Sequence, residues 1–379
     1  MKKFSIFFLI VIVSVIGCEE PSLTPNGNNN SSDPDPGASN AVTLASVTPI
    51  QIYGAWHASD DACTWGTVRT VTEFDSKNHW LIDRGDGRPS VNIVSLSFVH
   101  PLKLLNKTTD ATTLNGIPRG MTADIVNYFK SRGIRVMLSI GGITYVDAWN
   151  QALAQNGRQL GLNAAAVAQQ LGVGIEIDYE ENASPNLPAL QEFITAYRSL
   201  LPYDATGNNH AARLTIDLAA GDRWLIALCR HATANWLTTS NPVLDYANAM
   251  VTSRQLSADQ AIANWQEHVD GKAQYDPPIL PLAPAKFTGG IYIVTGTRAA
   301  PECIDFNTSL QKATGNYVQT VVPNGAGTTA GMLGYMFWAA ERPSTRRITT
   351  APPNSCEGGV GAGATFFNIP VPMPALRQQ

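Results

Sequence analysis

Short apolar runs alternate with helical patterns along most of this chain. The apolar runs are expected to be eight β-strands, at Gln51 to Trp56, Val91 to Val99, Arg135 to Ile140, Val173 to Asp178, Arg213 to Ala219, Leu244 to Val251, Gly290 to Val294 and Met332 to Trp338. Several are apolar on both faces, as is typical of strands that helices cover. Strands that alternate with helices predict a parallel sheet joined by crossover helices.

Four segments between the runs combine helical spacing of apolar residues with a start or stop signal. They are Thr122 to Arg132, Asn163 to Leu171, Leu187 to Leu200 and Ser257 to Val269, which begin with a Thr cap, an Asn cap, an early proline and a Ser capping box. Eight strands with interleaved helices predict an α/β fold, the (β/α)8 TIM barrel. Because the chain becomes rich in Pro and Gly after Trp338, we expect the last helix to be missing or replaced by an irregular tail.

The first residues have the pattern of an export signal. Lys2 and Lys3 precede an apolar run from Phe4 to Ile16, which is short for a membrane span. The run ends at Val15-Ile16-Gly17-Cys18, which resembles a bacterial lipobox, and this implies a lipoprotein signal over residues 1–17 and a lipid anchor at Cys18. In the alternative, the signal is an ordinary secretory one and Cys18 is incidental.

The composition changes after Cys18. Residues 18–45 are mostly polar, with many Pro, Asn, Ser and Gly, so they predict a disordered tether. Residues 46–379 contain no second linker and are expected to form one domain, a monomer. The expected location is the bacterial cell envelope, lipid-anchored at the outer membrane or the cell surface, with the choice between a periplasmic and an exposed face open.

The net charge and the cysteine pattern limit the classes of partner and ligand that we expect. The net charge is −4 and only 15% of residues are charged, with no basic stripe, which argues against nucleic acid as a partner. The four later cysteines form no CxxC pair, so a zinc site is not expected. They allow up to two disulfides or reduced buried thiols, and both readings stay open for Cys63, Cys229, Cys303 and Cys356.

Three acids in the fourth expected strand are the strongest candidates for chemistry. Glu176, Asp178 and Glu180 alternate with apolar residues, so in a strand all three carboxyls point to one face. Crowded carboxylates raise one another's pKa and can keep one acid protonated at neutral pH. Two structural alternatives remain. The segment could be a helix, which would place only Glu176 and Glu180 on one face, or it could be a strand at a sheet edge whose acids are solvated. Because catalytic groups of TIM barrels lie at the carboxyl ends of strands, the acids and the expected fold indicate the same site.

Four stretches resemble motifs of family 18 glycoside hydrolases, and they follow one another along the chain in the order that the family has. They are Gly174-Ile175-Glu176-Ile177-Asp178-Tyr179-Glu180 (family pattern DGxDxDxE), Val136 to Gly142 (SxGG), Leu214 to Ala220 (LTxAAP) and Gly334 to Trp338. The resemblance implies a retaining hydrolase of β-linked N-acetylglucosamine that uses the substrate's acetamido oxygen as the nucleophile. It implies Glu180 as the catalytic acid and Asp178 as the carboxylate that orients the acetamido group, without cofactor or metal.

Other residues take supporting or binding roles in this interpretation. Glu176 and Ser139 support the catalytic pair, with Ser139 holding backbone near the site. Trp338 is expected to stack on the sugar. Tyr53 falls where many members carry a strand-one Tyr, and Met250, in the sixth strand, is the third expected substrate contact.

Three departures from the family pattern leave the function open. Val173 replaces the first Asp, Glu176 replaces the second with a longer side chain, and residues 248–253 contain no Tyr. The expected partner is a glycan that contains N-acetylglucosamine. The expected activity is hydrolysis of chitin-type oligosaccharides. The alternatives are an endo-β-N-acetylglucosaminidase that cuts the N-glycan core and a sugar-binding protein with impaired turnover.

Overall fold

The computed structural model describes residues 47–59, 70–219, 221, 223–250, 257–292, 309–338, 340 and 359–377. The expected signal, the anchor Cys18 and the tether lie outside these residues, as do Cys63, Cys303 and Cys356. Across the described part of the chain, every helix is too short or too polar to cross a lipid bilayer.

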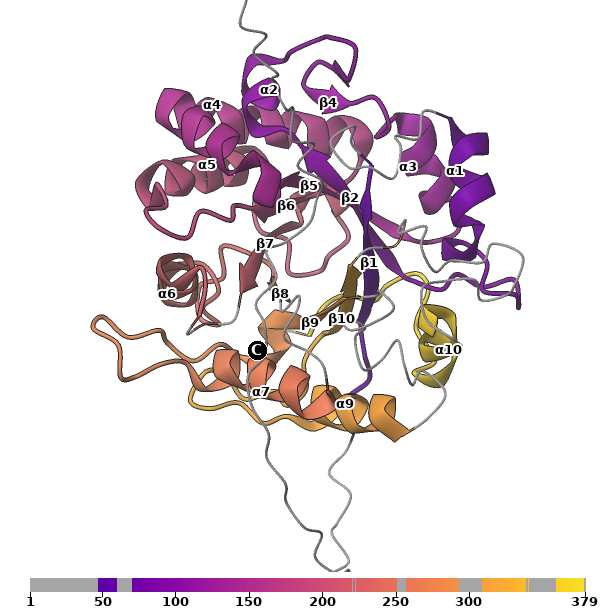
Figure 1. The fold of residues 1–379 in the computed structure, drawn as a ribbon, viewed down its shortest axis with the longest axis vertical. Helices are drawn as coiled ribbons and strands as arrows, with labels where there is room; N and C mark the ends of the chain where they lie inside the picture. Colours follow the sequence, from indigo (N-terminus) through magenta and orange to yellow (C-terminus); the bar gives the residue numbers. More distant parts are fainter. Residues whose placement is uncertain are drawn as a thin grey trace, which may run out of the picture.

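Eight parallel strands close into a barrel (Figure 1). They follow one another in chain order around the barrel, and the last pairs with the first. Their bounds are β1 Ile52–Ala58, β2 Ile93–Val99, β5 Arg135–Gly141, β6 Gly174–Asp178, β7 Leu214–Ala219, β8 Ala247–Met250, β9 Phe287–Tyr292 and β10 Gly334–Trp338. The predicted (β/α)8 barrel and its eight strands are confirmed.

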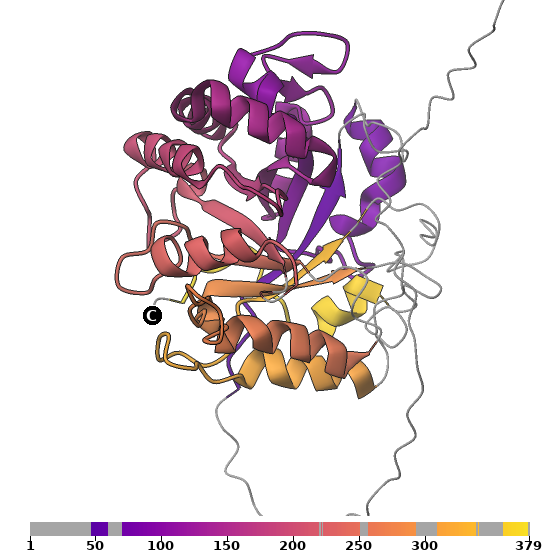
Figure 2. The same cartoon turned by 60° about the vertical axis from the view of Figure 1, so that its left-hand side comes forward.

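Helices surround the barrel in both views (Figures 1 and 2). They are α1 Val71–Asn78, α2 Pro101–Asn106, α3 Ala123–Lys130, α4 Val146–Leu171, α5 Leu187–Leu200, α6 Ile226–Asn235, α7 Ala258–Asp270, α9 Ser309–Thr320 and α10 Gly359–Phe366. Single 3-10 turns lie at His79–Leu81, Ile143–Tyr145, His210–Ala212 and Pro284–Lys286, and a small hairpin joins β3 Thr113–Leu114 to β4 Ile117–Pro118.

Two of the predicted helix starts are confirmed by their cap bonds. The hydroxyl of Thr122 accepts from the backbone N–H of Ile125, and that of Ser257 accepts from the N–H of Gln260. Helix α5 has the predicted bounds. Side-chain acceptors at these positions satisfy N–H groups that the first turn of a helix leaves without partners.

The predicted start of a helix at Asn163 is wrong. Helix α4 begins at Val146 and contains one kink, at Asn156, whose backbone is not helical (φ −169°, ψ 83°). The side chain of Asn156 accepts from the N–H of Gln159 at 2.8 Å, so it caps the second half of the helix. Asn163 instead donates to the carbonyl of Leu105 at 2.9 Å and joins α4 to α2.

The chain after β10 contains a helix where we expected none. Helix α10 packs over the outer face of β1 and β10, where the hydroxyl of Tyr53 donates to the carbonyl of Val360 at 2.9 Å. Phe367, which follows the helix, contacts the rings of both Tyr53 and Tyr335. A helix of small residues was missed because Gly and Ala gave no amphipathic pattern in the sequence.

The segment after α10 covers the amino-terminal end of the barrel. Asn92, just before β2, donates to the carbonyl of Pro370 at 3.0 Å, and Gln51, just before β1, donates to that of Ala375 at 2.7 Å. Arg377 donates to the carbonyl of Met332, just before β10. Because all three contacts precede strands, this tail closes the end of the barrel opposite to the expected site.

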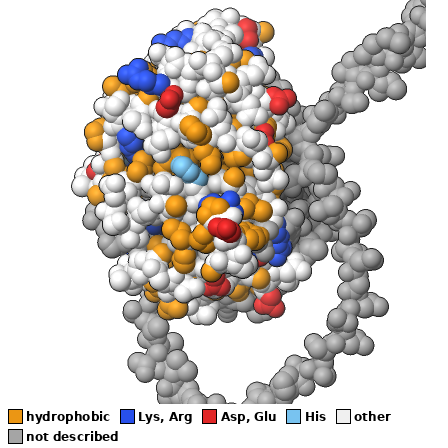
Figure 3. All heavy atoms as spheres, turned by 90° about the vertical axis from the view of Figure 1, so that its left-hand side faces the viewer, with side chains coloured by type: hydrophobic (Ala, Val, Ile, Leu, Met, Phe, Trp, Pro, Cys, Tyr) orange, Lys and Arg blue, Asp and Glu red, His pale blue; other side chains and the backbone are white. Residues whose placement is uncertain are grey.

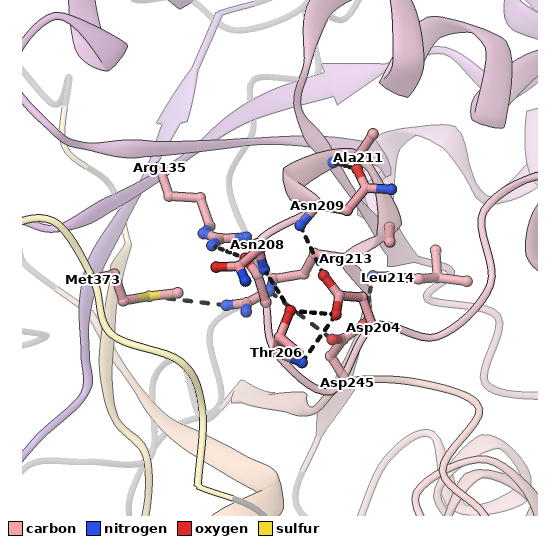
Figure 4. Close-up of polar contacts among 12 residues, drawn as sticks. Arg135, Asp204, Thr206, Asn208, Asn209, Ala211, Arg213, Leu214, Asp245 and Met373 are labelled. Carbon is pink, nitrogen blue, oxygen red and sulfur yellow. Dashed lines mark hydrogen bonds and ion pairs between the residues drawn. The ribbon is translucent and has the colours of Figure 1, made fainter.

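Basic side chains are buried at the same closed end (Figure 4). Arg135 donates to the carbonyl of Gly207 at 2.7 Å, and Arg213 lies 3.9 Å from the sulfur of Met373. Burial, and secondly the neighbouring Arg213, lower the pKa of Arg135 to about 9. Asp245 accepts from the N–H of Leu214 at 2.8 Å and balances part of this charge.

The outer surface has no comparable concentration of charge on the face that carries α4, α5 and α6. Acidic and basic side chains are scattered over this face among small groups of apolar atoms (Figure 3). A nucleic-acid-binding surface needs clustered basic side chains, and this face of the molecule has none.

Candidate active site

The three acids of the fourth strand behave as the alternation predicts. Glu176 lies in the middle of β6 and its carboxylate meets side chains of β1, β2 and β8, which places it inside the barrel. The intervening residues Ile175 and Ile177 belong to the apolar core outside the barrel. Asp178 ends the strand and Glu180 follows it, so the acids lie at the carboxyl end of the barrel.

Hydrogen-bond donors surround Glu176. Its Oε1 accepts from the indole N–H of Trp56 at 2.8 Å and from the hydroxyl of Ser95 at 3.0 Å, and its Oε2 accepts from the amide of Asn248 at 2.5 Å. Burial raises the pKa of Glu176, while these donors and the hydroxyl of Ser139 favour the charged form and limit that rise.

Asp178 lacks such support. Its side chain is 4% exposed, and its Oδ1 has no hydrogen-bond partner. Burial raises its pKa well above the ordinary value, and the negative charges of Glu180 and then Glu176 raise it further. Burial and the neighbouring charges therefore favour the neutral form of Asp178, and a nearby positive charge would favour its ionised form.

Glu180 completes the set of predicted acids. It is 8% exposed, in the irregular segment directly after β6. Its charge is the largest electrostatic influence on Asp178 after burial, so the two carboxyls lie close together. Glu180 is thus at the carboxyl end of the barrel, two residues beyond the last residue of β6.

The stretch from Ser139 to Gly142 holds the backbone behind Asp178. Gly141 has φ +119°, and a Cβ at this position would overlap with the carbonyl oxygen of Asp178 and the indole of Trp149, so only glycine fits. That carbonyl accepts from the N–H of Gly142 at 2.9 Å and from the indole of Trp149 at 3.0 Å. Ser139 pairs with Glu176 across β5 and β6, although its hydroxyl lies outside full hydrogen-bond geometry.

A fourth carboxyl group lies in the same layer, and the sequence reading missed it. Asp217 of β7 is 1% exposed and pairs with Asn248 of β8. Burial, followed by the charges of Glu176 and Asp178, raises its pKa well above the ordinary value. The sequence contains a signal for this residue, because an acid within an otherwise apolar strand of Leu, Ile and Ala is unusual. The stretch was interpreted only as a family motif, so Asp217 was not considered.

Aromatic side chains line part of the barrel mouth. Trp338, at the end of β10, is partly buried, and its ring centroid lies 5.5 Å from that of Phe98 at the end of β2. Tyr145, from the turn after β5, packs against the same cluster. Partly exposed rings at the carboxyl end of a barrel, such as those of Trp338 and Tyr145, can stack on the apolar face of a sugar.

The structure does not bring every predicted residue to the site. Tyr53 is fully buried on the outer face of β1, so it does not reach the acids. Trp56, three residues later and on the inner face, makes the contact from this strand instead. Met250 ends β8, two residues after Asn248, and therefore shares its face at the mouth.

Val173, at the position of the first Asp of the resembling motif, lies in the apolar core outside the barrel. Cys229 is a buried free thiol whose Sγ lies 3.3 Å from the carbonyl of Ala219. Among the described residues, no group of three or more His, Cys, Asp or Glu side chains is placed to hold a metal ion.

No model of a known protein family matches the chain, and no curated protein matches it. Solved structures similar to it include the catalytic domain of psychrophilic chitinase B from Arthrobacter TAD20 (14% identity, 86% of this chain and 98% of that chain, TM-score 0.48). A family 18 chitinase from Cycas revoluta in complex with (GlcNAc)3 is 13% identical over 83% of this chain and 99% of that chain, with a TM-score of 0.48.

A chitinase-like agglutinin from Robinia pseudoacacia is similar to the same degree, at 12% identity over 83% of this chain and 99% of that chain, with a TM-score of 0.48. At such identities and TM-scores below 0.5, these likenesses say nothing about individual residues. The fold follows from the closed strand order itself.

Proposed function

We propose that this protein is a retaining glycoside hydrolase that cleaves β-1,4-linked N-acetylglucosamine in chitin-type oligosaccharides with help from the substrate's acetamido group. The observation that carries the proposal is the pair Asp178 and Glu180 at the carboxyl end of β6, with Glu176 fixed below them by three donors. The resemblance of this strand to the family 18 motif supports the same roles.

Glu180 is the proposed general acid. It protonates the glycosidic oxygen as the bond to the anomeric carbon breaks, while the acetamido oxygen of the same sugar attacks that carbon from the opposite face. The oxazolinium ion that forms carries a positive charge. Water then attacks the anomeric carbon and returns a proton to Glu180, which restores the enzyme and retains the configuration.

Asp178 is the proposed partner of the acetamido group. At rest the proton is on Asp178 and Glu180 carries the negative charge that favours it there. As the substrate binds, Asp178 gives this proton to Glu180, which passes it to the glycosidic oxygen, and Asp178 becomes the carboxylate that faces the developing positive charge; after hydrolysis the proton returns from Glu180 to Asp178. A carboxylate that is already in place stabilises this charge without reorganisation of solvent. Trp338 with Phe98 is the proposed stacking surface for the sugar ring.

Product analysis tests the proposal. The domain from about residue 46 onward is incubated with chito-oligosaccharides and with a high-mannose glycopeptide. Shortened N-acetylglucosamine chains support chitin-type hydrolysis. Cleavage of the glycopeptide alone supports an endo-β-N-acetylglucosaminidase, which would use the same two carboxyls. Tight oligosaccharide binding without products would support the sugar-binding alternative, for which the lack of a Tyr in residues 248–253 is the reason.

The location of the protein in the cell is a separate proposal. We infer that residues 1–17 are removed as a lipoprotein signal, that Cys18 carries the lipid, and that residues 18–45 connect the anchor to a single monomeric barrel in the cell envelope. A glycan polymer cannot enter a cell, so an enzyme that acts on it has to be placed outside.

A further inference from the structure

The inner surface of β6, β7 and β8 carries more acid than the proposed reaction uses. Residue pairing between β6 and β7 runs from Ile175 with Leu214 to Ile177 with Ile216. The same register, continued by one residue, sets Asp178 beside Asp217, and the charge of Asp178 is among those that raise the pKa of Asp217. Asp217 in turn pairs with Asn248 on β8. These residues therefore form one continuous polar patch with Glu176, in the layer just below the mouth of the barrel.

Hydrogen-bond donors are distributed unevenly over this patch. Glu176 receives three, from Trp56, Ser95 and Asn248. The Oδ1 atoms of Asp178 and of Asp217 have no partner. The donors therefore stabilise a negative charge on Glu176, whereas one carboxyl oxygen of each aspartate lacks a donor.

The orientation of Asn248 explains why the donors favour Glu176. Its Oδ1 accepts from the hydroxyl of Thr288 at 2.7 Å, which leaves the amide N–H groups facing the acids. One N–H is donated to Glu176 at 2.5 Å. The same amide group also lies beside Asp217 and limits the rise of its pKa.

From this geometry we propose that Asp217 is a positioning residue of the proposed active site: it stays protonated as a neutral acid beside Asp178, so that Asp178 is the aspartate that ionises during the reaction. The proposal rests on the proposed function and adds to it a residue at which this chain departs from the resembling LTxAAP pattern, which has an apolar residue at this position. The proton stays on Asp217 throughout and is not transferred to the substrate.

The two aspartates lie at the same level of the barrel, so their immediate surroundings decide which one keeps its proton. Asp217 is 1% exposed within a strand, whereas Asp178 is 4% exposed at a strand end, next to Glu180 and to the space that a substrate would occupy. A positive charge on the sugar therefore acts on Asp178 first. A neutral Asp217 adds no negative charge beside it and supplies an O–H donor where the patch lacks one.

The charged and titratable groups around Asp217 agree with this assignment. Burial raises its pKa most, followed by Glu176, Asp178 and Glu180 from β6 and the segment after it. From β8 the neighbouring side chain is the neutral Asn248, and Tyr246 lies one layer below. Burial also raises the pKa of Glu176, but hydrogen bonds from Ser139, Trp56, Ser95 and Asn248 oppose that rise, whereas only Asn248 does so for Asp217.

Infrared spectroscopy of the purified protein tests the protonation without turnover. At pH 7 the difference spectrum between wild type and Asp217→Asn should contain the C=O band of a protonated carboxylic acid. Asp204→Asn is the matched control: Asp204 lies in an exposed loop, where hydrogen bonds from Thr206 and Asn209 lower its pKa, so its difference spectrum should show a carboxylate. A carboxylate band from Asp217 at pH 7 would overturn the proposal.

The titration of Asp178 in two variants of Asp217 distinguishes a positioning role of Asp217 from a purely structural one. With Asp178→Asn used to assign its band, Asp178 should ionise at wild-type pH in Asp217→Asn, which keeps a donor. In Asp217→Ala it should ionise about one pH unit higher, a tenfold change in the equilibrium. Equal titration of Asp178 in all three proteins would overturn the proposal, as would a change in Asp217→Asn alone.

Kinetics provides the second readout. The acid limb of the kcat profile should move to higher pH in Asp217→Ala, with KM little changed, and Asp217→Asn should restore the wild-type limb. An unchanged acid limb in Asp217→Ala contradicts the proposal. If wild type cleaves no N-acetylglucosamine chain, the proposed hydrolysis fails, while the infrared titrations still decide the state of Asp217.

Discussion

The indole N–H of Trp56 on β1 donates a 2.8 Å hydrogen bond across the barrel to Oε1 of Glu176 on β6. Both side chains are almost completely buried. A hydrogen bond to a charged group contributes more than one between neutral groups, and removal of one partner leaves the other unsatisfied in a dry environment. This bond therefore links the first strand of the barrel to the charge state of the site.

Trp56→Phe removes this donor and keeps an aromatic ring. We expect the pKa of Glu176 to rise, because its charged form loses a stabilising hydrogen bond, so a carboxylate at this position requires a higher pH. The acid limb of the pH–rate profile should move upward, and the free energy of unfolding should fall by about 1.5–3 kcal/mol.

Trp236→Phe is the matched control for this change. Trp236 is also fully buried and donates from its indole nitrogen, to Gln191 at 2.6 Å, but it lies outside the site. It should lose stability without a shift of the acid limb. Equal pH profiles for the two variants would show that the Trp56 bond does not influence the reaction.

Glu180→Gln should keep the fold and sugar binding but remove most hydrolysis. Gln is nearly isosteric with Glu and cannot donate the required proton, and general acid catalysis contributes about 10² to 10⁴ in rate. Steady-state kinetics on chito-oligosaccharides measures the loss.

Glu181→Gln is the control for Glu180→Gln. This neighbouring acid accepts from Asn150 at 2.9 Å and from the N–H of Ala183 at 2.7 Å, away from Asp178. It should stay within a few-fold of wild type. Activity of Glu180→Gln close to that of Glu181→Gln would refute the assignment of the acid.

The substrate should have to carry the nucleophile. N-acetylated chains should be cleaved and cellulose oligomers left intact, because glucose has a hydroxyl in place of the acetamido group. A thiazoline mimic of the oxazolinium should inhibit, since intermediate-like ligands bind more tightly than substrates. Asp178→Asn should weaken this inhibition more than it weakens binding of N-acetylglucosamine oligomers. Comparable cleavage of glucan would exclude substrate assistance.

The buried acids should make stability depend on pH in an unusual direction. Because the folded pKa of Asp217 is raised above its unfolded value, its proton stabilises the folded state, and this stabilisation is lost as pH rises from about 4 towards the folded pKa. The stability of Asp217→Asn relative to wild type should therefore increase by about 1.4 kcal/mol for each pH unit from about pH 4 to pH 7, starting from equal stability near pH 3.

Urea midpoints measured from pH 3 to pH 8 check this expectation. Asp204→Asn should show the opposite sign, since its folded pKa is lowered and its contribution to stability is present at neutral pH and lost in acid. A pH-independent difference between Asp217→Asn and wild type would show that Asp217 is ionised in the folded protein.

Cys18→Ser should release the protein from the membrane fraction and leave the barrel folded. A single acyl chain binds a membrane only marginally, so the lipidated form should carry more than one. Fractionation followed by circular dichroism of the soluble form measures both effects. Unchanged membrane partition of the variant would refute the lipoprotein proposal.

Local sequence patterns were sufficient to predict the strands, the face on which their side chains lie and several helix starts. Period-two alternation put the acids of β6 on one face, and side-chain caps located the starts of α3 and α7. These features depend on neighbours within a few residues. A local signal also produced the wrong helix start at Asn163. An Asn can cap a helix or lie inside one, and only its hydrogen bond to α2 shows that Asn163 lies inside α4.

Closure of the barrel decided the rest. Alternation states that Tyr53 and Trp56 point to opposite faces, but it does not state which of them points inward, and only the pairing of β1 with β2 and β10 placed Trp56 beside Glu176. Asp217 joins Asp178 through the register of two strands almost 40 positions apart in sequence. The sequence by itself thus determined the strands, their faces and the catalytic candidates, because these follow from local periodicity. The tertiary structure decided which side chains surround them, because burial and inter-strand register depend on residues far apart in the chain.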